Sequence, residues 1–210
     1  MDIDIRTLLS RLNLACKHGM EQAAQLCVRQ THYSVDVEHL LLVLLEADAP
    51  DLRAILGRFG LRAEALTEQL QEAIDQFKRG NGRTPALSPN FSPLFQEAWL
   101  LSSMLLGQQQ IRSGTLVLAL LEVDSLRGLL LESAPALLKI PRTSLREELP
   151  AILAGSAEDA GGTGGAGVGK PAGAEAEGVG AARPTGGAGM PAGIAMPTLD
   201  GSAGTRQSAL

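Results

Sequence analysis

The sequence predicts an all-α fold built on a duplicated helical unit, and three observations support this prediction. Residues 36–46 have the pattern of a short helix in which six consecutive aliphatic residues, 40–45, occupy every face, so we expect other helices to surround it. A related stretch, 111–122, follows 76 positions later and aligns Leu40 with Leu116. No segment shows the alternating apolar pattern of a strand. The two stretches therefore predict two buried central helices in equivalent places of two repeats.

The segments that follow each central helix extend the duplication. Residues 52–56 are matched by 126–130 at an offset of 74, and residues 66–70 by 145–149 at an offset of 79. The changing offset indicates short insertions in loops, which a duplicated unit tolerates. We therefore expect two repeats of about four helices each, joined by the loop at residues 80–85.

One additional helix is predicted ahead of the first repeat. The pattern predicts this front helix over residues 7–18, ended or kinked at Gly19, and the first helix of the repeat over residues 20–31. The front helix has one apolar face, formed by Leu8, Leu9, Leu12 and Ala15.

Composition divides the chain at residue 155. Residues 155–210 contain 16 of the 24 glycines and none of the six aromatic residues, so they cannot bury enough apolar surface to offset the entropy of ordering. We expect this segment to be a disordered tail or linker. Residues 1–154 are rich in Leu and Ala and are long enough to form one compact domain.

Charge and targeting signals exclude several classes of protein. The net charge of −5 divides into −3 over residues 1–154 and −2 over residues 155–210, and the absence of a basic run argues against a nucleic-acid partner. The acidic N-terminus lacks a signal-peptide core, and no apolar stretch reaches membrane-spanning length. We expect a cytoplasmic protein with no membrane partner. Cys16 and Cys27 are expected to be buried free thiols.

The central motif resembles that of a known family. Residues 37–42 read Val-Glu-His-Leu-Leu-Leu, and residues 114–121 repeat the apolar part. Together with the duplication, this layout resembles the N-terminal substrate-recognition domain of Clp-type AAA+ unfoldases, which are chaperones; this doubled module is called the Clp N or Clp R domain. The resemblance covers about residues 6–154 and implies protein binding without catalysis, since the family's ATPase modules are not in this sequence. It also implies a structural role for Glu38, His39, Leu40 and Leu41.

Within this family, the front of the chain is similar to the ClpV unfoldases, which recycle contracted type VI secretion sheaths. The similarity lies in residues 11–13, 16–17, 26–28 and 32–35 and in the additional front helix. It implies that the N-terminal helix of a sheath subunit docks in a groove beside the front helix. The expected groove residues are Leu8, Leu12, Ala15, Met20, Ala23, Ala24 and Phe91. For each of them, ordinary core packing remains the alternative.

A second hypothesis is a free-standing structural adaptor that docks on a Clp ATPase or protease and regulates it. Because hexamers in the family form through the ATPase modules, we expect an isolated domain of this kind to be a monomer. Binding of a sheath helix, as opposed to co-purification with an intact Clp ATPase, separates the two hypotheses.

Signals of catalysis or of cofactor binding are weak. Residues 164–170 match the phosphate-loop spacing up to Lys170, but Pro171 stands where a Ser or Thr should bind magnesium. Such matches arise by chance in a glycine-rich segment. The three histidines and two cysteines fit no closed zinc spacing. We therefore expect no cofactor, no metal and no catalytic residues.

Overall fold

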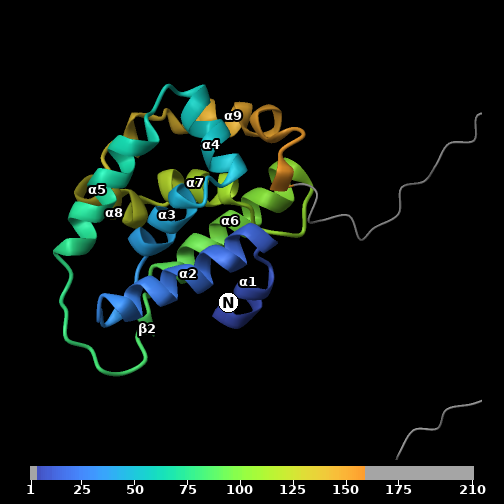
Figure 1. Cartoon of the computed structure of the whole chain (residues 1–210). Helices are drawn as coiled ribbons and strands as arrows, with labels where there is room; N and C mark the ends of the chain where they lie inside the picture. Colours follow the sequence, from blue (N-terminus) through green and yellow to red (C-terminus); the bar gives the residue numbers. More distant parts are fainter. Residues whose placement is uncertain (1–3, 159–210) are drawn as a thin grey trace, which may run out of the picture. The chain divides into compact units, whose positions relative to one another are not determined.

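The computed structural model describes residues 4–158, which form nine α-helices, one short 3₁₀ helix and two strands of two residues each (Figure 1). The all-α prediction is confirmed, with four helices in each repeat and one in front. Most of the expected tail, including the match at residues 164–170, lies outside the described residues. In chain order the elements are α1 (Ile5–Ser10), α2 (Leu14–Arg29), β1 (Ser34–Val35), α3 (Val37–Glu46), α4 (Pro50–Arg58), α5 (Ala63–Asp75), β2 (Ala86–Leu87), α6 (Phe91–Leu106), α7 (Ser113–Glu122), α8 (Asp124–Ser133), η1 (Leu137–Lys139) and α9 (Arg142–Leu153).

Helices α3 and α7 are the buried centres of the two repeats. Each has ten residues; α3 is buried from Val37 to Leu44, and α7 is buried from Ser113 to Leu121. Helix α2 packs against α3, and α6 packs in the equivalent way against α7. The helices α2–α5 therefore correspond to α6–α9, in the order that the repeated segments predict.

The two repeats also complete each other. Helix α4 of the first repeat packs against α7 and α9 of the second, and α5 packs against α8. The segment before α2 pairs with the segment before α7: the Asn13 N–H donates to the Ile111 carbonyl at 2.9 Å, and the Ile111 N–H donates to the Arg11 carbonyl at 2.8 Å. The equivalent parallel pairing joins β1 to β2. Because core contacts and backbone hydrogen bonds both cross between the repeats, the two form a single packed core.

The predicted boundary between the first two helices is wrong. The chain breaks at residues 11–13, where α1 has ended and Asn13 starts α2 by accepting a hydrogen bond from the Cys16 N–H at 2.9 Å. Gly19 lies inside α2, at a position where a Cβ atom would come within 2.9 Å of the Leu44 Cδ2. Gly19 therefore allows α2 to approach α3 closely and does not end a helix.

The two central helices begin with the same type of hydrogen bond, in which the N–H of the residue before the helix donates to the side chain of the third helical residue. The accepting side chains differ. The Asp36 N–H donates to His39 Nδ1 at 3.0 Å, and the Arg112 N–H donates to Thr115 Oγ1 at 3.1 Å. In the first repeat the four residues of the expected structural motif, Glu38, His39, Leu40 and Leu41, are all buried. Burial also raises the pKa of the Glu38 carboxyl above its ordinary value. The motif is thus part of the core at the start of α3.

Gly114 occupies the place in α7 that Glu38 occupies in α3, and it leaves no room for a side chain. A Cβ atom there would lie 2.8 Å from Leu153 Cδ1 and 3.3 Å from Asp51 Cβ, and both of these residues are buried. We expect Gly114→Ala to lower the free energy of unfolding by about 1–3 kcal/mol, because the core around it is filled. The matched control is Gly128→Ala in α8, where nothing lies within 4 Å; it should raise the stability by about 0.5–1 kcal/mol through helix propensity. Urea unfolding measures both, and equal effects would contradict the packing argument.

The remaining expectations about the chain concern membranes and thiols. Of the helices between residues 4 and 158, none combines the length and the apolarity needed to cross a membrane.

Cys16 and Cys27 are free and buried, as expected. Burial raises the pKa of the Cys16 thiol well above its ordinary value, and the nearby carboxylates of Glu158 and Asp51 raise it further. The Cys16 thiol therefore stays protonated and acts as a packing group.

Candidate functional site

Helix α2 has two faces with different surroundings. The face toward α3 is fully packed and is formed by Cys16, Gly19, Ala23 and Cys27. The neighbouring face carries three apolar side chains at four-residue spacing, which are Met20, Ala24 and Val28. Met20 and Ala24 are partly exposed, and Val28 is 57% exposed. This second face leaves apolar surface open to solvent.

A hollow of about 580 Å³ lies along the C-terminal half of this face. Its walls come from α2, from the β1–β2 pair and from the segment leading into β2, which lies near α2 in Figure 1. Gln25, Arg29 and Thr84 supply its polar edge. Its apolar lining consists of Ala24, Val28, Val35, Pro85 and Leu87. We call this hollow the α2 groove.

The local sequence explains why the α2 groove is open and why its wall is ordered. Ala24 contributes only a methyl group, so space remains above α2 at this position. The opposite wall is held by the parallel strand pair, in which the Ser88 N–H donates to the Val35 carbonyl at 2.9 Å and the Ala86 N–H donates to the Tyr33 carbonyl at 3.0 Å. An apolar groove with a fixed wall suits the anchor side chains of an amphipathic helix.

The structure places the seven expected groove residues in two groups. Four of them are at most 1% exposed and lie in the core: Leu8, Leu12, Ala23 and Phe91. Ala15, Met20 and Ala24 are partly exposed, and Ala24 lines the α2 groove. Helix α1 packs against α6, so its apolar side chains are largely covered. Which of the seven contact a partner remains a prediction.

Sequence reasoning missed four apolar residues of the α2 groove: Val28, Val35, Pro85 and Leu87. Val28 continues the spacing of Met20 and Ala24, so the four-residue period could have identified it. No such signal exists for Pro85 and Leu87. They reach α2 only because β2 pairs with β1, which lies about fifty positions earlier in the chain.

A second hollow, of about 470 Å³, lies at the other end of α2. It is lined by the start of α2 with Leu14, Ala15 and His18, by Pro50 of α4, and by Ala157 and Glu158 after α9. Leu14 is 76% exposed. Ala15, predicted as a groove residue, therefore borders this second hollow and not the α2 groove.

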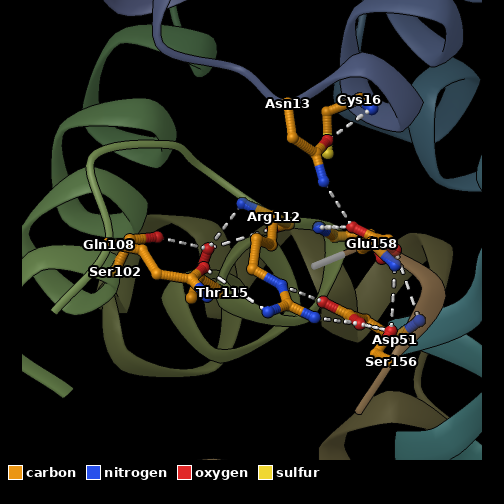
Figure 2. Close-up of polar contacts among 10 residues, drawn as sticks. Asn13, Cys16, Asp51, Ser102, Gln108, Arg112, Thr115, Ser156 and Glu158 are labelled. Atoms are coloured by element: carbon orange, nitrogen blue, oxygen red, sulfur yellow. Dashed lines mark hydrogen bonds and ion pairs between the residues drawn. The ribbon is translucent and has the colours of Figure 1, made fainter. Parts of the chain in front are cut away.

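A buried ion pair joins Arg112 and Asp51, the residue after Pro50 in the second hollow (Figure 2). The guanidinium of Arg112 donates from Nε to Asp51 Oδ2 and from Nη2 to Asp51 Oδ1, both at 2.8 Å. Arg112 is 2% exposed and Asp51 is fully buried. The pair joins the start of α7 to the start of α4, so it fixes the two repeats against each other.

Two buried histidines lie at the start of α3, and their hydrogen bonds determine their tautomers. His39 Nδ1 accepts from the Asp36 N–H, so the proton of neutral His39 is on Nε2. His39 Nε2 lies 2.9 Å from His32 Nδ1, which must accept that proton's hydrogen bond. His32 then carries its own proton on Nε2, with the ring edge-on to Phe77. His39 thus has both ring nitrogens in hydrogen bonds, whereas His32 Nε2 is buried and has no hydrogen-bond partner among the described residues.

The remaining side chains give no sign of a metal site. Among residues 4–158, no group of three or more His, Cys, Asp or Glu side chains is placed to hold a metal ion. The fold and the α2 groove together define a doubled helical domain whose open apolar surface is suited to binding a protein segment.

Comparison with known proteins identifies the family. A profile of the Clp repeat (R) N-terminal domain matches residues 11–134, which is more than half of the sequence. The chain belongs to the Clp repeat (R) N-terminal domain family. This confirms the family resemblance of the central motif and of the duplication.

The relatives include ClpV proteins and the chaperone protein ClpB of Yersinia enterocolitica, which is 28% identical over 158 residues. The AAA+ ATPase ClpV1 of Pseudomonas aeruginosa is 27% identical over 152 residues, which are 72% of this chain and 17% of that protein. The solved N-domain of ClpV from Vibrio cholerae is 34% identical, with a TM-score of 0.61 over 75% of this chain and 94% of that one. A structure described as the complex of a ClpV N-domain with a VipB peptide is 36% identical, with a TM-score of 0.59 over 75% and 96% of the two chains. The chain spans less than a fifth of the curated relatives it matches.

Proposed function

We propose that this domain recognises a helix of a type VI secretion sheath subunit in the cytoplasm and, as part of a ClpV-like unfoldase, presents that subunit for disassembly and recycling of the sheath. The domain binds as a monomer and performs no catalysis. The observation that carries this proposal is the open α2 groove, an apolar channel beside a helix. The similarity to a ClpV N-domain solved with a VipB peptide supports a peptide ligand.

The chemistry of the α2 groove describes the ligand it fits. Its apolar lining suits two or three aliphatic side chains on one face of a helix, at spacings of three or four residues. Arg29 at the edge is exposed and suits an acidic or polar residue on the flank of the ligand. Ala24 allows the backbone of the ligand helix to lie close to α2.

The test is isothermal titration of the chain with a synthetic N-terminal helix of the sheath subunit from the same organism. We expect saturable one-to-one binding. Val28→Glu should weaken it about 30-fold, because a charge placed in an apolar contact is buried without a partner. Val28 is chosen over Leu12 because Leu12 is 1% exposed and its substitution would disturb the fold.

A matched control separates the groove from general effects of surface charge. Leu131 on α8 is 66% exposed, lines none of the hollows described above, and is similar in size and accessibility to Val28. Leu131→Glu should leave the affinity unchanged. Equal affinities for wild type, Val28→Glu and Leu131→Glu would exclude the α2 groove as the binding site. No binding by a folded wild-type chain would favour the adaptor hypothesis, which co-purification with a Clp ATPase then tests.

A further inference from the structure

Residues 155–158, one position beyond the end of α9, fold back onto the domain. Gly155, with φ of +75°, turns the chain after Leu153, and Glu158 returns to the interior, where it is only 8% exposed. The composition of the sequence assigns these residues to the tail, yet they contact the ends of helices from both repeats. We call residues 155–158 the strap.

The carboxylate of Glu158 holds the strap in place through four hydrogen bonds (Figure 2). Its Oε2 accepts from Asn13 Nδ2 at 2.7 Å and from the Ser113 N–H at 3.1 Å. Its Oε1 accepts from the Asp51 N–H at 3.2 Å and from the Ser113 hydroxyl. One side chain thereby contacts the starts of α2, α4 and α7.

These contacts satisfy a requirement that the helices themselves leave open. Ala49 and Arg112, the residues that precede α4 and α7, have no side-chain oxygen that could accept from the free N–H groups of the first turn. Glu158 supplies that oxygen to both helices at once, and its negative charge faces the positive ends of both helix dipoles. These interactions offset the repulsion between the Glu158 carboxylate and the nearby Asp51 carboxylate. The charge of Asp51 is itself balanced by Arg112.

The strap also connects to the helix that carries the α2 groove. Asn13 donates its amide to Glu158 and, through Oδ1, caps α2 at the Cys16 N–H. The second hollow lies between the start of α2 and the strap, with Ala157 and Glu158 in its wall. Ser156 donates a further hydrogen bond to Asp51. Opening of the strap would therefore widen this hollow, uncap α4 and α7, and release the side chain of Asn13, which caps α2, without removing apolar groups from the core.

We propose that the strap is a latch. In the closed state, Glu158 caps α4 and α7, orients the Asn13 cap of α2, and makes the chain leave the domain beside the start of α2 instead of at the end of α9. In the open state, the helix starts are hydrated and the chain leaves from Leu153. Because the latch consists of four residues held mainly by polar contacts, it opens as a local unit while the core stays folded.

Amide hydrogen exchange of the full chain, followed by NMR, tests the latch in wild type, Glu158→Ala and Glu158→Gln. We expect the Asp51 and Ser113 amides to exchange about 10-fold faster in Glu158→Ala, the amount typical of a lost helix cap. Glu158→Gln should show a similar or smaller increase, because its oxygen still accepts, while its NH₂ group faces N–H donors and finds an acceptor only in the Ser113 hydroxyl. Glu147→Ala, an exposed change on α9, is the control and should match wild type.

The pattern of exchange decides between a latch and an ordinary piece of core. A latch predicts faster exchange at Asp51, Ser113 and Cys16, with the amides of central α3 unchanged. Unchanged exchange at Asp51 and Ser113 would overturn the proposal. An equal increase at every amide would also overturn it, because the strap would then be an integral part of the cooperative core.

Discussion

Arg112→Met is expected to lower the free energy of unfolding by about 3–5 kcal/mol, the amount typical of removing one partner of a buried ion pair. The substitution keeps most of the side-chain volume but leaves the Asp51 carboxylate buried without its two 2.8 Å hydrogen bonds from the guanidinium. The carboxylate of Glu158 lies nearby, so two negative charges would share the site. The cost therefore comes from the uncompensated charge more than from lost packing.

Urea unfolding of the full chain measures this effect, and two variants serve as controls. Arg53→Met removes the cation of an exposed pair with Asp48, in which both side chains are more than 60% exposed, and should cost less than about 1 kcal/mol. The double variant Arg112→Met with Asp51→Leu removes both buried charges and should recover much of the loss. A cost below about 1 kcal/mol for Arg112→Met would show that water reaches Asp51 and that the pair does not lock the repeats.

Acid is expected to destabilise the domain through the two histidines at the start of α3. Burial, together with the neighbouring His32, lowers the pKa of His39 to about 4. Burial also lowers the pKa of His32, and Arg79 adds to that shift. Asp36 acts in the opposite direction on both rings and is outweighed. Protonation of His39 at Nδ1 would abolish the hydrogen bond from the Asp36 N–H. That hydrogen bond stabilises the start of α3.

The direction of the pH dependence follows from these shifts. Between about pH 6.5 and pH 4 the unfolded chain binds a proton at His39 that the folded chain does not, so stability falls as the pH falls. A lowering of the pKa to about 4 corresponds to a loss of roughly 3 kcal/mol over this range. The raised pKa of Glu38 acts oppositely and adds stability as that carboxyl becomes protonated.

Comparison of variants separates the contribution of His39 to the pH dependence of stability from the contribution of the carboxyl groups. Unfolding free energies of wild type and His39→Gln, measured from pH 7 to pH 4, should differ in slope, with the variant much flatter below pH 6.5. His18→Gln, which replaces an exposed histidine on α2, is the matched substitution control. NMR titration of the His39 ring should show its midpoint near pH 4. A midpoint near 6.5 would refute the buried, neutral histidine pair.

Local patterns in the sequence were enough to predict the architecture. The two leucine-rich stretches predict α3 and α7 because a helix that is apolar on every face must be surrounded by other helices, and this property is visible within ten residues. The repeated offsets predict the order of the surrounding helices. The break between α1 and α2 was missed because Gly19 has the same local signal whether it ends a helix or allows close packing.

The candidate site depended on contacts that periodicity does not specify. The spacing of residues on α2 shows that Ala23 and Ala24 both lie on apolar faces. Ala23 is buried because α3 packs over it, and Ala24 lines a groove because the β1–β2 pair stands opposite it. Arg112 and Asp51 are separated by 61 positions. Glu158 lies in a segment whose composition indicates a tail, and its four donors come from residues 13, 51 and 113.

The sequence by itself therefore determined that the chain forms two helical repeats around α3 and α7, since secondary structure and burial follow from short-range apolar patterns. Only the tertiary structure decided where the surface stays open and which charges meet. A groove is a place where neighbouring side chains leave space, and an ion pair or a helix cap depends on the distance between atoms far apart in the chain; both result from how the helices pack.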